Sequence, residues 1–172
     1  MLYILLIVIV ILAMGLAMKN EYVTSRDIII NKPKAEVYDY IKMLRNQNQY
    51  SYYNRKDPDT IKSYSGTDGE VGFTYTFSSK LNTIGSGTQT IVKLVEGESM
   101  TCNILFVKPT KLESRAEISL TAIDAQTTKV TWTFTSNYKF PLNIIIYFLD
   151  LEKLIGTDIA SSLVTLKEKL KN

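Results

Sequence analysis

The first eighteen residues stand apart from the rest of the chain because they are almost uniformly apolar. Residues 1–18 carry no charged side chain, and Gly15 alone falls outside the hydrophobic residue types. As a helix this segment would be about 27 Å long, at about 1.5 Å per residue, which is close to the hydrocarbon thickness of a bilayer. A core helix would show a polar stripe or end sooner. We therefore expect a transmembrane anchor over residues 1–19, with residues 2–18 in the membrane, and a separate domain over residues 20–172.

The flanks of this segment bear on its retention and its orientation. No Lys or Arg precedes it, so it lacks the basic region with which a secretory signal usually begins. Residues 15–17 nevertheless resemble a small-x-small cleavage site, which leaves removal of the segment as an alternative. Four basic residues follow the segment, namely Lys19, Arg26, Lys32 and Lys34. By the positive-inside rule we predict a retained single-pass anchor with the domain in the cytoplasm.

Beyond the anchor, the hydrophobic pattern predicts a strand, a helical region and then a series of strands. Residues 22–30 end in three isoleucines, which favours a strand. Apolar side chains then recur at helical spacing at Val37, Tyr40, Ile41 and Leu44, and the tyrosine-rich residues 46–53 predict a short second helix. Alternation of apolar and polar residues between turn signals predicts strands over 61–65, 73–77, 88–95, 100–107, 112–123 and 129–138. Their short connections make neighbouring strands antiparallel.

The chain closes with a long amphipathic pattern. Apolar residues recur every three or four positions from Phe148 to Leu170, and Pro141 fits the first turn of a helix. The spacing predicts one helix over residues 141–170. The predicted fold class is therefore α+β, with a curved antiparallel sheet wrapped around a long C-terminal helix.

Composition narrows the chemistry. The chain contains no histidine, which removes His-based triads and HExxH zinc sites, and Cys102 is its one cysteine, which removes intrachain disulfides and Cys-rich metal clusters. The net charge of +3 is small and the basic residues are scattered, so nucleic acid is not an expected partner. We expect no metal and no cofactor, and we identify no catalytic constellation.

Four stretches in order resemble the SRPBCC superfamily, the helix-grip group that includes START domains and polyketide cyclase/dehydrase-like proteins. The first is IINKP with EVY at residues 29–38, and the second is residues 69–77 with the following IGSG. The third is TKVTW at residues 128–132, and the fourth is DLEKLIGTD at residues 150–158, which is similar to the terminal helix of small membrane-tethered members. Many relatives carry tryptophans after the first helix where this chain has Tyr50 and Tyr53, which implies a more polar entrance.

The resemblance implies an apolar cavity between the sheet and the terminal helix. Its entrance is expected near residues 50–53 and at the turn of residues 85–87, whose glycines can move. The aromatic alternations would line it, although plain core packing needs the same residues. The candidate ligand-binding residues are Tyr50, Tyr53, Phe73, Tyr75, Phe77, Phe106, Trp132, Phe134, Phe148, Leu151 and Ile155.

From these observations we expect a protein that binds, and in some way transports or senses, a hydrophobic, lipid-like small molecule. One alternative is a cyclase- or dehydratase-type enzyme that uses Tyr, Lys or carboxylate groups in the cavity. The other is a protein-interaction module whose cavity has collapsed. The three differ in what the interior should contain: a cavity with walls that are apolar, a cavity with an interior charge, or solid packing.

Overall fold

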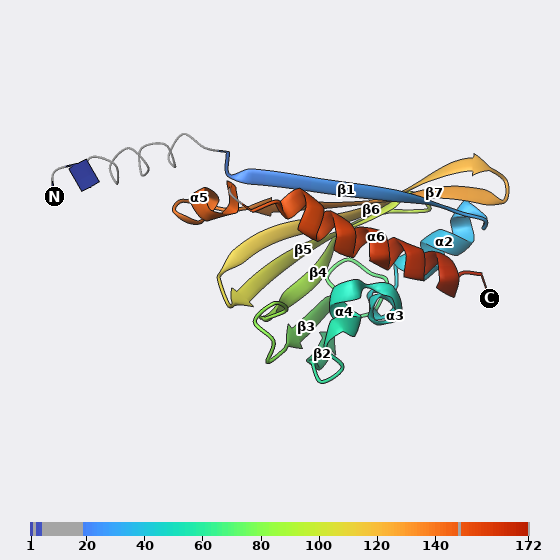
Figure 1. Cartoon of the computed structure of the whole chain (residues 1–172). Helices are drawn as coiled ribbons and strands as arrows, with labels where there is room; N and C mark the ends of the chain where they lie inside the picture. The colour runs from blue at the N-terminus through green and yellow to red at the C-terminus, as the bar shows by residue number, and fades with distance from the viewer. Residues whose placement is uncertain (2, 5–18, 148, 172) are drawn as a thin grey trace.

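The computed structural model describes residues 1, 3–4, 19–147 and 149–171, and its centre is a seven-stranded antiparallel sheet (Figure 1). The strand order is β1-β7-β6-β5-β4-β3-β2. The strands are β1 (Glu21–Ile30), β2 (Ile61–Ser65), β3 (Thr74–Ser78), β4 (Ser86–Val95), β5 (Ser99–Lys108), β6 (Leu112–Asp124) and β7 (Thr127–Asn137). Each strand from β2 to β6 pairs with the next one in sequence, and β1 pairs with β7. The predicted antiparallel sheet is confirmed.

Alternating side chains give the sheet one buried face. Along β6, Ala116, Ile118 and Leu120 are buried, and each lies opposite a residue of β7 that also faces the interior. Ile118 pairs with Trp132, for example, and Leu120 pairs with Val130. Because side chains alternate across a strand, the polar residues between them face the other side.

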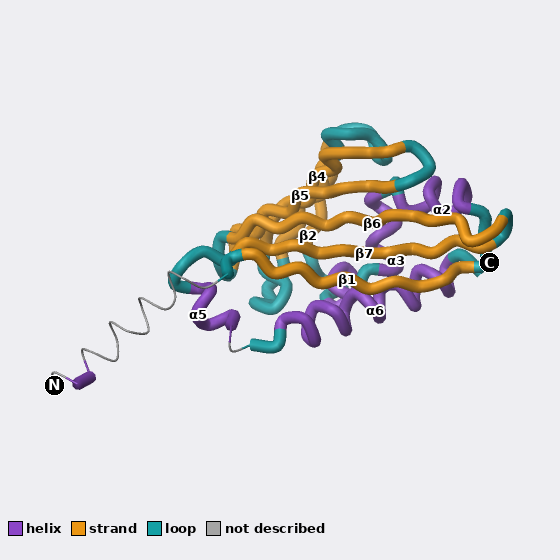
Figure 2. Tube along the Cα trace, turned by 90° about the horizontal axis from the view of Figure 1, so that it is seen from above, coloured by secondary structure: helices purple, strands orange, loops and turns teal. Residues whose placement is uncertain are grey.

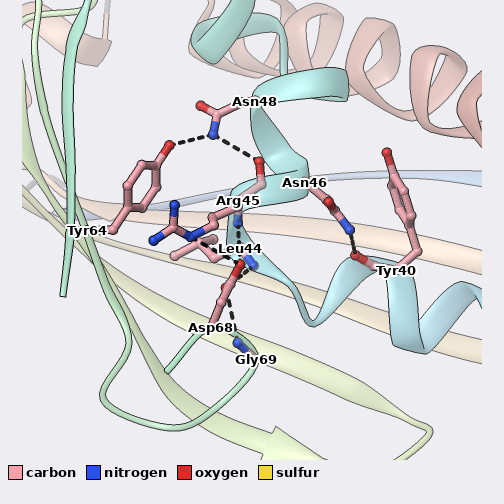
Figure 3. A network of polar contacts seen from close by, with 8 residues as sticks. All are labelled: Tyr40, Leu44, Arg45, Asn46, Asn48, Tyr64, Asp68 and Gly69. Atoms are coloured by element: carbon pink, nitrogen blue, oxygen red, sulfur yellow. Dashed lines mark hydrogen bonds and ion pairs between the residues drawn. The ribbon is translucent and has the colours of Figure 1, made fainter. Parts of the chain in front are cut away.

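A group of short helices covers one end of this buried face. They are α2 (Lys34–Ile41), the 3-10 turn η1 (Leu44–Asn46), α3 (Gln47–Tyr50) and α4 (Tyr52–Lys56). Figure 3 shows how Asp68, in the turn between β2 and β3, holds the start of η1: its carboxylate accepts hydrogen bonds from the amides of Leu44 (2.7 Å) and Arg45 (3.2 Å). The Arg45 guanidinium also stacks over the Tyr64 ring of β2, 4.1 Å from its centroid. The predicted single helix through Leu44 therefore ends at Ile41, where the chain turns to meet the sheet.

The predicted long terminal helix is wrong in one respect, because it is two helices. α5 (Leu142–Tyr147) and α6 (Leu151–Lys169) are separated by a break that includes Leu149 and Asp150. Asp150 has a non-helical backbone, and its carboxylate accepts a hydrogen bond from the amide of Lys153 at 3.0 Å. A side chain that caps a helix in this way favours a new start over continuation, which the hydrophobic spacing does not reveal.

α6 packs inside the curve of the sheet, against β1 and β7 and against α3 and α4 (Figure 1). Seen from above, it runs alongside β1 (Figure 2). Gly156 makes close contact between α6 and β1 possible, because a Cβ there would lie 2.2 Å from the guanidinium of Arg26. Arg26 also forms an ion pair with Glu152 at 2.6 Å.

No helix in the described ranges combines the length and the apolar character needed to cross a membrane. Residues 5–18, on which the predicted anchor falls, lie outside the described residues. The anchor and the division into residues 1–19 and 20–172 therefore stay predictions.

Candidate functional site

A cavity of about 380 Å³ lies between the buried face of the sheet and α6. Its walls come from β3 to β7 and from α3 to α6, and most of them are apolar. The sheet contributes Phe77, Phe106, Trp132 and Phe134, and α6 contributes Ile155 and Ile159. The two layers therefore enclose space at this place instead of interlocking.

The structure separates the eleven candidate residues into three groups. The residues that line the cavity are Tyr53, Tyr75, Phe77, Phe106, Trp132, Phe134 and Ile155. Tyr50 and Phe73 instead lie in the packed core, with 0% and 1% of their surface exposed. Phe148 and the side chain of Leu151 lie outside the described part of the chain. Whether any of the lining residues binds a ligand stays a prediction.

Aromatic contacts hold one wall of the cavity in place. The Tyr75 ring stacks on Tyr64 with 5.4 Å between centroids and lies 5.7 Å from the ring of Phe77. Phe77 in turn meets Phe106 edge to face at 5.9 Å. Since such pairs restrain one another, this row of rings from β2 to β5 forms a wall of defined shape.

Tyr50 does not lie at the entrance as expected, and the reason is local. Tyr50 ends α3 and its ring packs edge to face on Trp132, 6.0 Å between centroids, behind the cavity wall. Tyr53 lies in the next short helix, where it lines the cavity and keeps 37% of its surface exposed. Neither position is evident from spacing, because α3 and α4 are too short to show a helical period.

The expectation that the glycines of residues 85–87 can move is not supported by the contacts around them. Ser86 and Gly87 belong to β4, and Gly85 directly precedes it. A Cβ at Gly85 would lie 1.9 Å from the carbonyl oxygen of Lys108, and one at Gly87 would lie 2.3 Å from that of Leu105. These glycines let the backbones of the two neighbouring segments approach closely.

Several polar groups are set among the apolar walls. Buried Gln89 donates a hydrogen bond to the side-chain oxygen of Gln47 at 3.1 Å. Ser162 accepts a hydrogen bond from the amide of Tyr52 (2.8 Å) and donates to the carbonyl oxygen of Asp158 (2.7 Å). The side chain of Asp158 also lines the cavity, and it is the one carboxylate among the described lining residues.

Sequence reasoning missed Asp158, although a signal for it exists. Asp158 lies three residues after Ile155 and one before Ile159, so all three share one face of α6. An acidic residue within an apolar helical face is uncommon and points to a function or a partner.

The tyrosines of the cavity are held in their neutral form. Burial raises the pKa of Tyr75. The pKa of Tyr53 is also raised, first by its packed surroundings and then by the nearby Asp158 carboxylate, to which its hydroxyl donates a hydrogen bond. Burial raises the pKa of Tyr138 as well, against a hydrogen bond with Ser136. All three therefore act as hydrogen-bond donors near neutral pH rather than as bases.

Comparison with known proteins places the fold. No family model matches the chain, and no curated protein matches it. Solved structures do match. Norcoclaurine synthase of Thalictrum flavum, in complex with dopamine and hydroxybenzaldehyde, is 10% identical and has a TM-score of 0.65, and the match covers 91% of this chain and 90% of that one.

Two further structures show the same architecture. A protein of Nitrosospira multiformis is 15% identical with a TM-score of 0.60, over 86% of this chain and 95% of that chain. The Aha1 dimer of Colwellia psychrerythraea is 17% identical with a TM-score of 0.57, over 86% and 94%. The chain therefore has the helix-grip fold that these structures share. The same fold serves binding proteins and enzymes, so function depends on the site.

Proposed function

We propose that the protein binds a hydrophobic small molecule in the cavity between the sheet and α6. The observation that carries this proposal is the space itself, about 380 Å³ with aromatic and aliphatic walls. Pockets for small ligands are typically about 300 to 1,000 Å³, mostly apolar, with a few polar groups that orient the ligand. Filling such space removes apolar surface of the ligand from water at about 25 cal/mol per Å².

A collapsed interaction module is the weaker interpretation. Protein interiors are normally packed to the density of organic crystals, with few voids larger than a water molecule. A void of this size would reduce stability if it stayed empty, because the residues around it lose contacts. A bound ligand would restore contacts to the residues around the space and so offset that cost.

An enzyme is the second candidate, and Asp158 is the observation that favours it. A carboxylate inside the cavity is a potential acid or base, and Tyr53 lies beside it. The raised pKa of Tyr53 makes its phenol a poor acid, and no Lys or Arg of the described residues lines the cavity. We therefore rank catalysis below binding.

Trp132 allows a direct test of binding, because it is the chain's one tryptophan and it lines the cavity. The experiment titrates the full chain with 11-bromo-1-undecanol, whose bromine quenches tryptophan at contact. We expect saturable quenching of Trp132 fluorescence. Native mass spectrometry of the purified protein should also show copurified hydrophobic molecules. Linear, unsaturable quenching together with no copurified molecule would refute the proposal.

A matched pair of variants on β6 sharpens this test. Ala116 is buried and lines the cavity, whereas Ala122 lies on the same strand and is exposed. Ala116→Leu fills part of the space and should weaken binding by about tenfold or more, equivalent to at least about 1.4 kcal/mol. Ala122→Leu should leave binding unchanged. Circular dichroism of both variants verifies that the fold is retained.

A further inference from the structure

We propose that Asp158 makes the cavity select hydrophobic molecules with a cationic amine, an inference that rests on the proposed function. The carboxylate lies on the face of α6 that lines the cavity, between Ile155 and Ile159. No Lys or Arg of the described residues forms an ion pair with it, unlike Glu152, which pairs with Arg26. Tyr53 supplies one neutral donor and no charge.

A ligand that brings a positive charge satisfies this arrangement best. A carboxylate partly removed from water is stabilised by an opposite charge, and hydrogen bonds between charged groups are stronger than neutral ones. An ammonium group supplies the charge and three donors together. A ligand carboxylate at the same place would face like-charge repulsion from Asp158, and a neutral alcohol would supply a single donor.

The test uses three straight-chain molecules of ten carbons each as competitors of 11-bromo-1-undecanol at pH 7. We expect decylamine to restore Trp132 fluorescence at a concentration about tenfold lower than decanol, with decanoate weaker still. Asp158→Asn should bring decylamine and decanol within about twofold of each other. Glu168→Gln, which neutralises an exposed carboxylate on α6, should leave the order unchanged.

The outcomes separate this inference from the proposed function. Competition by decanol tests whether the cavity takes a hydrophobic molecule at all, and it involves no charge on the ligand. If decanol competes but decylamine shows no advantage, or keeps its advantage in Asp158→Asn, the role of Asp158 is refuted while the binding function stands. If none of the three competes, the proposed binding function itself is refuted.

A separate set of observations concerns the loops at the mouth of the cavity. The antiparallel order brings the β3–β4, β5–β6 and post-β7 connections to one end of the sheet, because Ser86 pairs with both Ser78 and Lys108. We call residues 79–85, 108–111 and 138–142 the mouth loops. Each of them contributes residues to the cavity wall, including Ile84, Pro109 and Tyr138.

The mouth loops combine exposed apolar side chains with positive charge. Leu81 and Phe140 keep 45% and 40% of their surface exposed. The loops contain no acidic residue, and their four lysines are all exposed: Lys80, Lys108, Lys111 and Lys139. Acidic residues lie close by in adjoining segments: the carboxylate of Asp57 accepts a hydrogen bond from the hydroxyl of Ser79, and Glu113 follows Lys111 in β6. Apolar side chains ringed by lysines suit the boundary between lipid headgroups and acyl chains.

The predicted anchor would bring these loops towards a membrane. The amide of Tyr138 donates a hydrogen bond to the carbonyl oxygen of Asn20 at 2.8 Å, so the point where the predicted anchor joins the domain lies among the mouth loops. We infer that the mouth loops dock on an anionic bilayer, which would open the cavity towards the lipid. This surface is distinct from the predicted anchor and adds to it.

Two labelled positions test the docking in the full chain, reconstituted in nanodiscs. Leu81→Cys places a fluorophore in a mouth loop, and Val71→Cys places it in the β2–β3 loop at the opposite end of the sheet, where Val71 is 62% exposed. The native Cys102 is buried and is replaced by Ser in both. We expect a lipid-borne nitroxide to quench the label at 81 at least twofold more than the label at 71, and more strongly with anionic phosphatidylglycerol than with phosphatidylcholine alone.

Charge reversal provides the second arm of this experiment. Lys80→Glu, Lys111→Glu and Lys139→Glu together should abolish the effect of phosphatidylglycerol on the label at 81, because the attraction depends on charge. Lys129→Glu on β7, away from the mouth, should not. Equal quenching at 71 and 81, or quenching at 81 that does not respond to anionic lipid, would overturn the docking proposal.

Discussion

The two halves of α6 lie against the same sheet and yet face different interiors. In the second half, Leu163 and Leu166 are 1% and 0% exposed and belong to a solidly packed core with Val37 and Ile41. In the first half, Ile155 and Asp158 line the cavity. The same three- and four-residue spacing runs through both halves. Periodicity thus identifies which face of a helix turns inward, but not whether that face meets side chains or space.

The largest expected effect is a difference in stability between substitutions in the two halves of α6. Leu166→Ala should lower the free energy of unfolding by about 3 kcal/mol, because it creates a new cavity in packed surroundings. Ile155→Ala should cost about 1 kcal/mol, since Ile155 is only partly buried and its removal widens a space that already exists. Urea denaturation of both variants measures the difference. Equal losses would mean that the first half of α6 is as tightly packed as the second.

A second prediction concerns Gly85, which directly follows the cavity-lining residue Ile84. Gly85→Ala should cost about 2 kcal/mol, because it combines a positive φ of 69° with a clash against the Lys108 carbonyl. Gly97 has the same φ but open space around it, so Gly97→Ala should cost about 1 kcal/mol. Thermal unfolding of the two variants compares them. If Gly85→Ala lowers stability no more than Gly97→Ala does, the chain around Gly85 can move to accommodate a side chain.

The smallest effect comes from the neutral tyrosines of the cavity half. Burial raises the pKa of Tyr75 in the folded protein above its usual value near 10, so the unfolded chain loses this proton more readily. The stabilising contribution is complete below about pH 10 and is lost as the pH rises towards the folded-state pKa. Between pH 8 and pH 10.5, the free energy of unfolding should therefore fall by about 1 kcal/mol less in Tyr75→Phe than in the unchanged protein. An unchanged decline in denaturant titrations at the two pH values would contradict this prediction.

Much of the fold is evident from the sequence because the sheet follows simple rules. Strands with one buried face alternate, so β6 and β7 are predicted to within a few residues, and short turns impose the antiparallel order. The break at Asp150 is not predicted, since an acidic residue fits a helix surface as well as a helix start. Aromatic residues such as Phe77 and Trp132 are correctly placed on the inward face.

The sequence does not predict which inward-facing residues line the cavity and which belong to the packed core. Phe73 and Tyr75 are two positions apart and both stack on Tyr64, yet Phe73 lies in the packed core and Tyr75 lines the cavity. The two rings differ in their other neighbours: the Arg45 guanidinium of η1 lies 5.8 Å from the centroid of the Phe73 ring, whereas Tyr75 adjoins Phe77 of the cavity wall. The sequence does not reveal which of these neighbours reaches which ring. Asp158 is missed for a different reason, because a search for apolar spacing leaves out the polar residues, Asp158 and Ser162, on the same face of α6.

The direction of α6 has a practical consequence for engineering this protein. The helix begins beside the break at Leu149 and Asp150 and ends at Lys169, so the last described residue, Lys171, lies at the opposite end of the domain from α5 (Figure 1). A fluorescent protein or purification tag fused at this end of the domain would lie far from α5. Such fusions are the suitable format for imaging and capture.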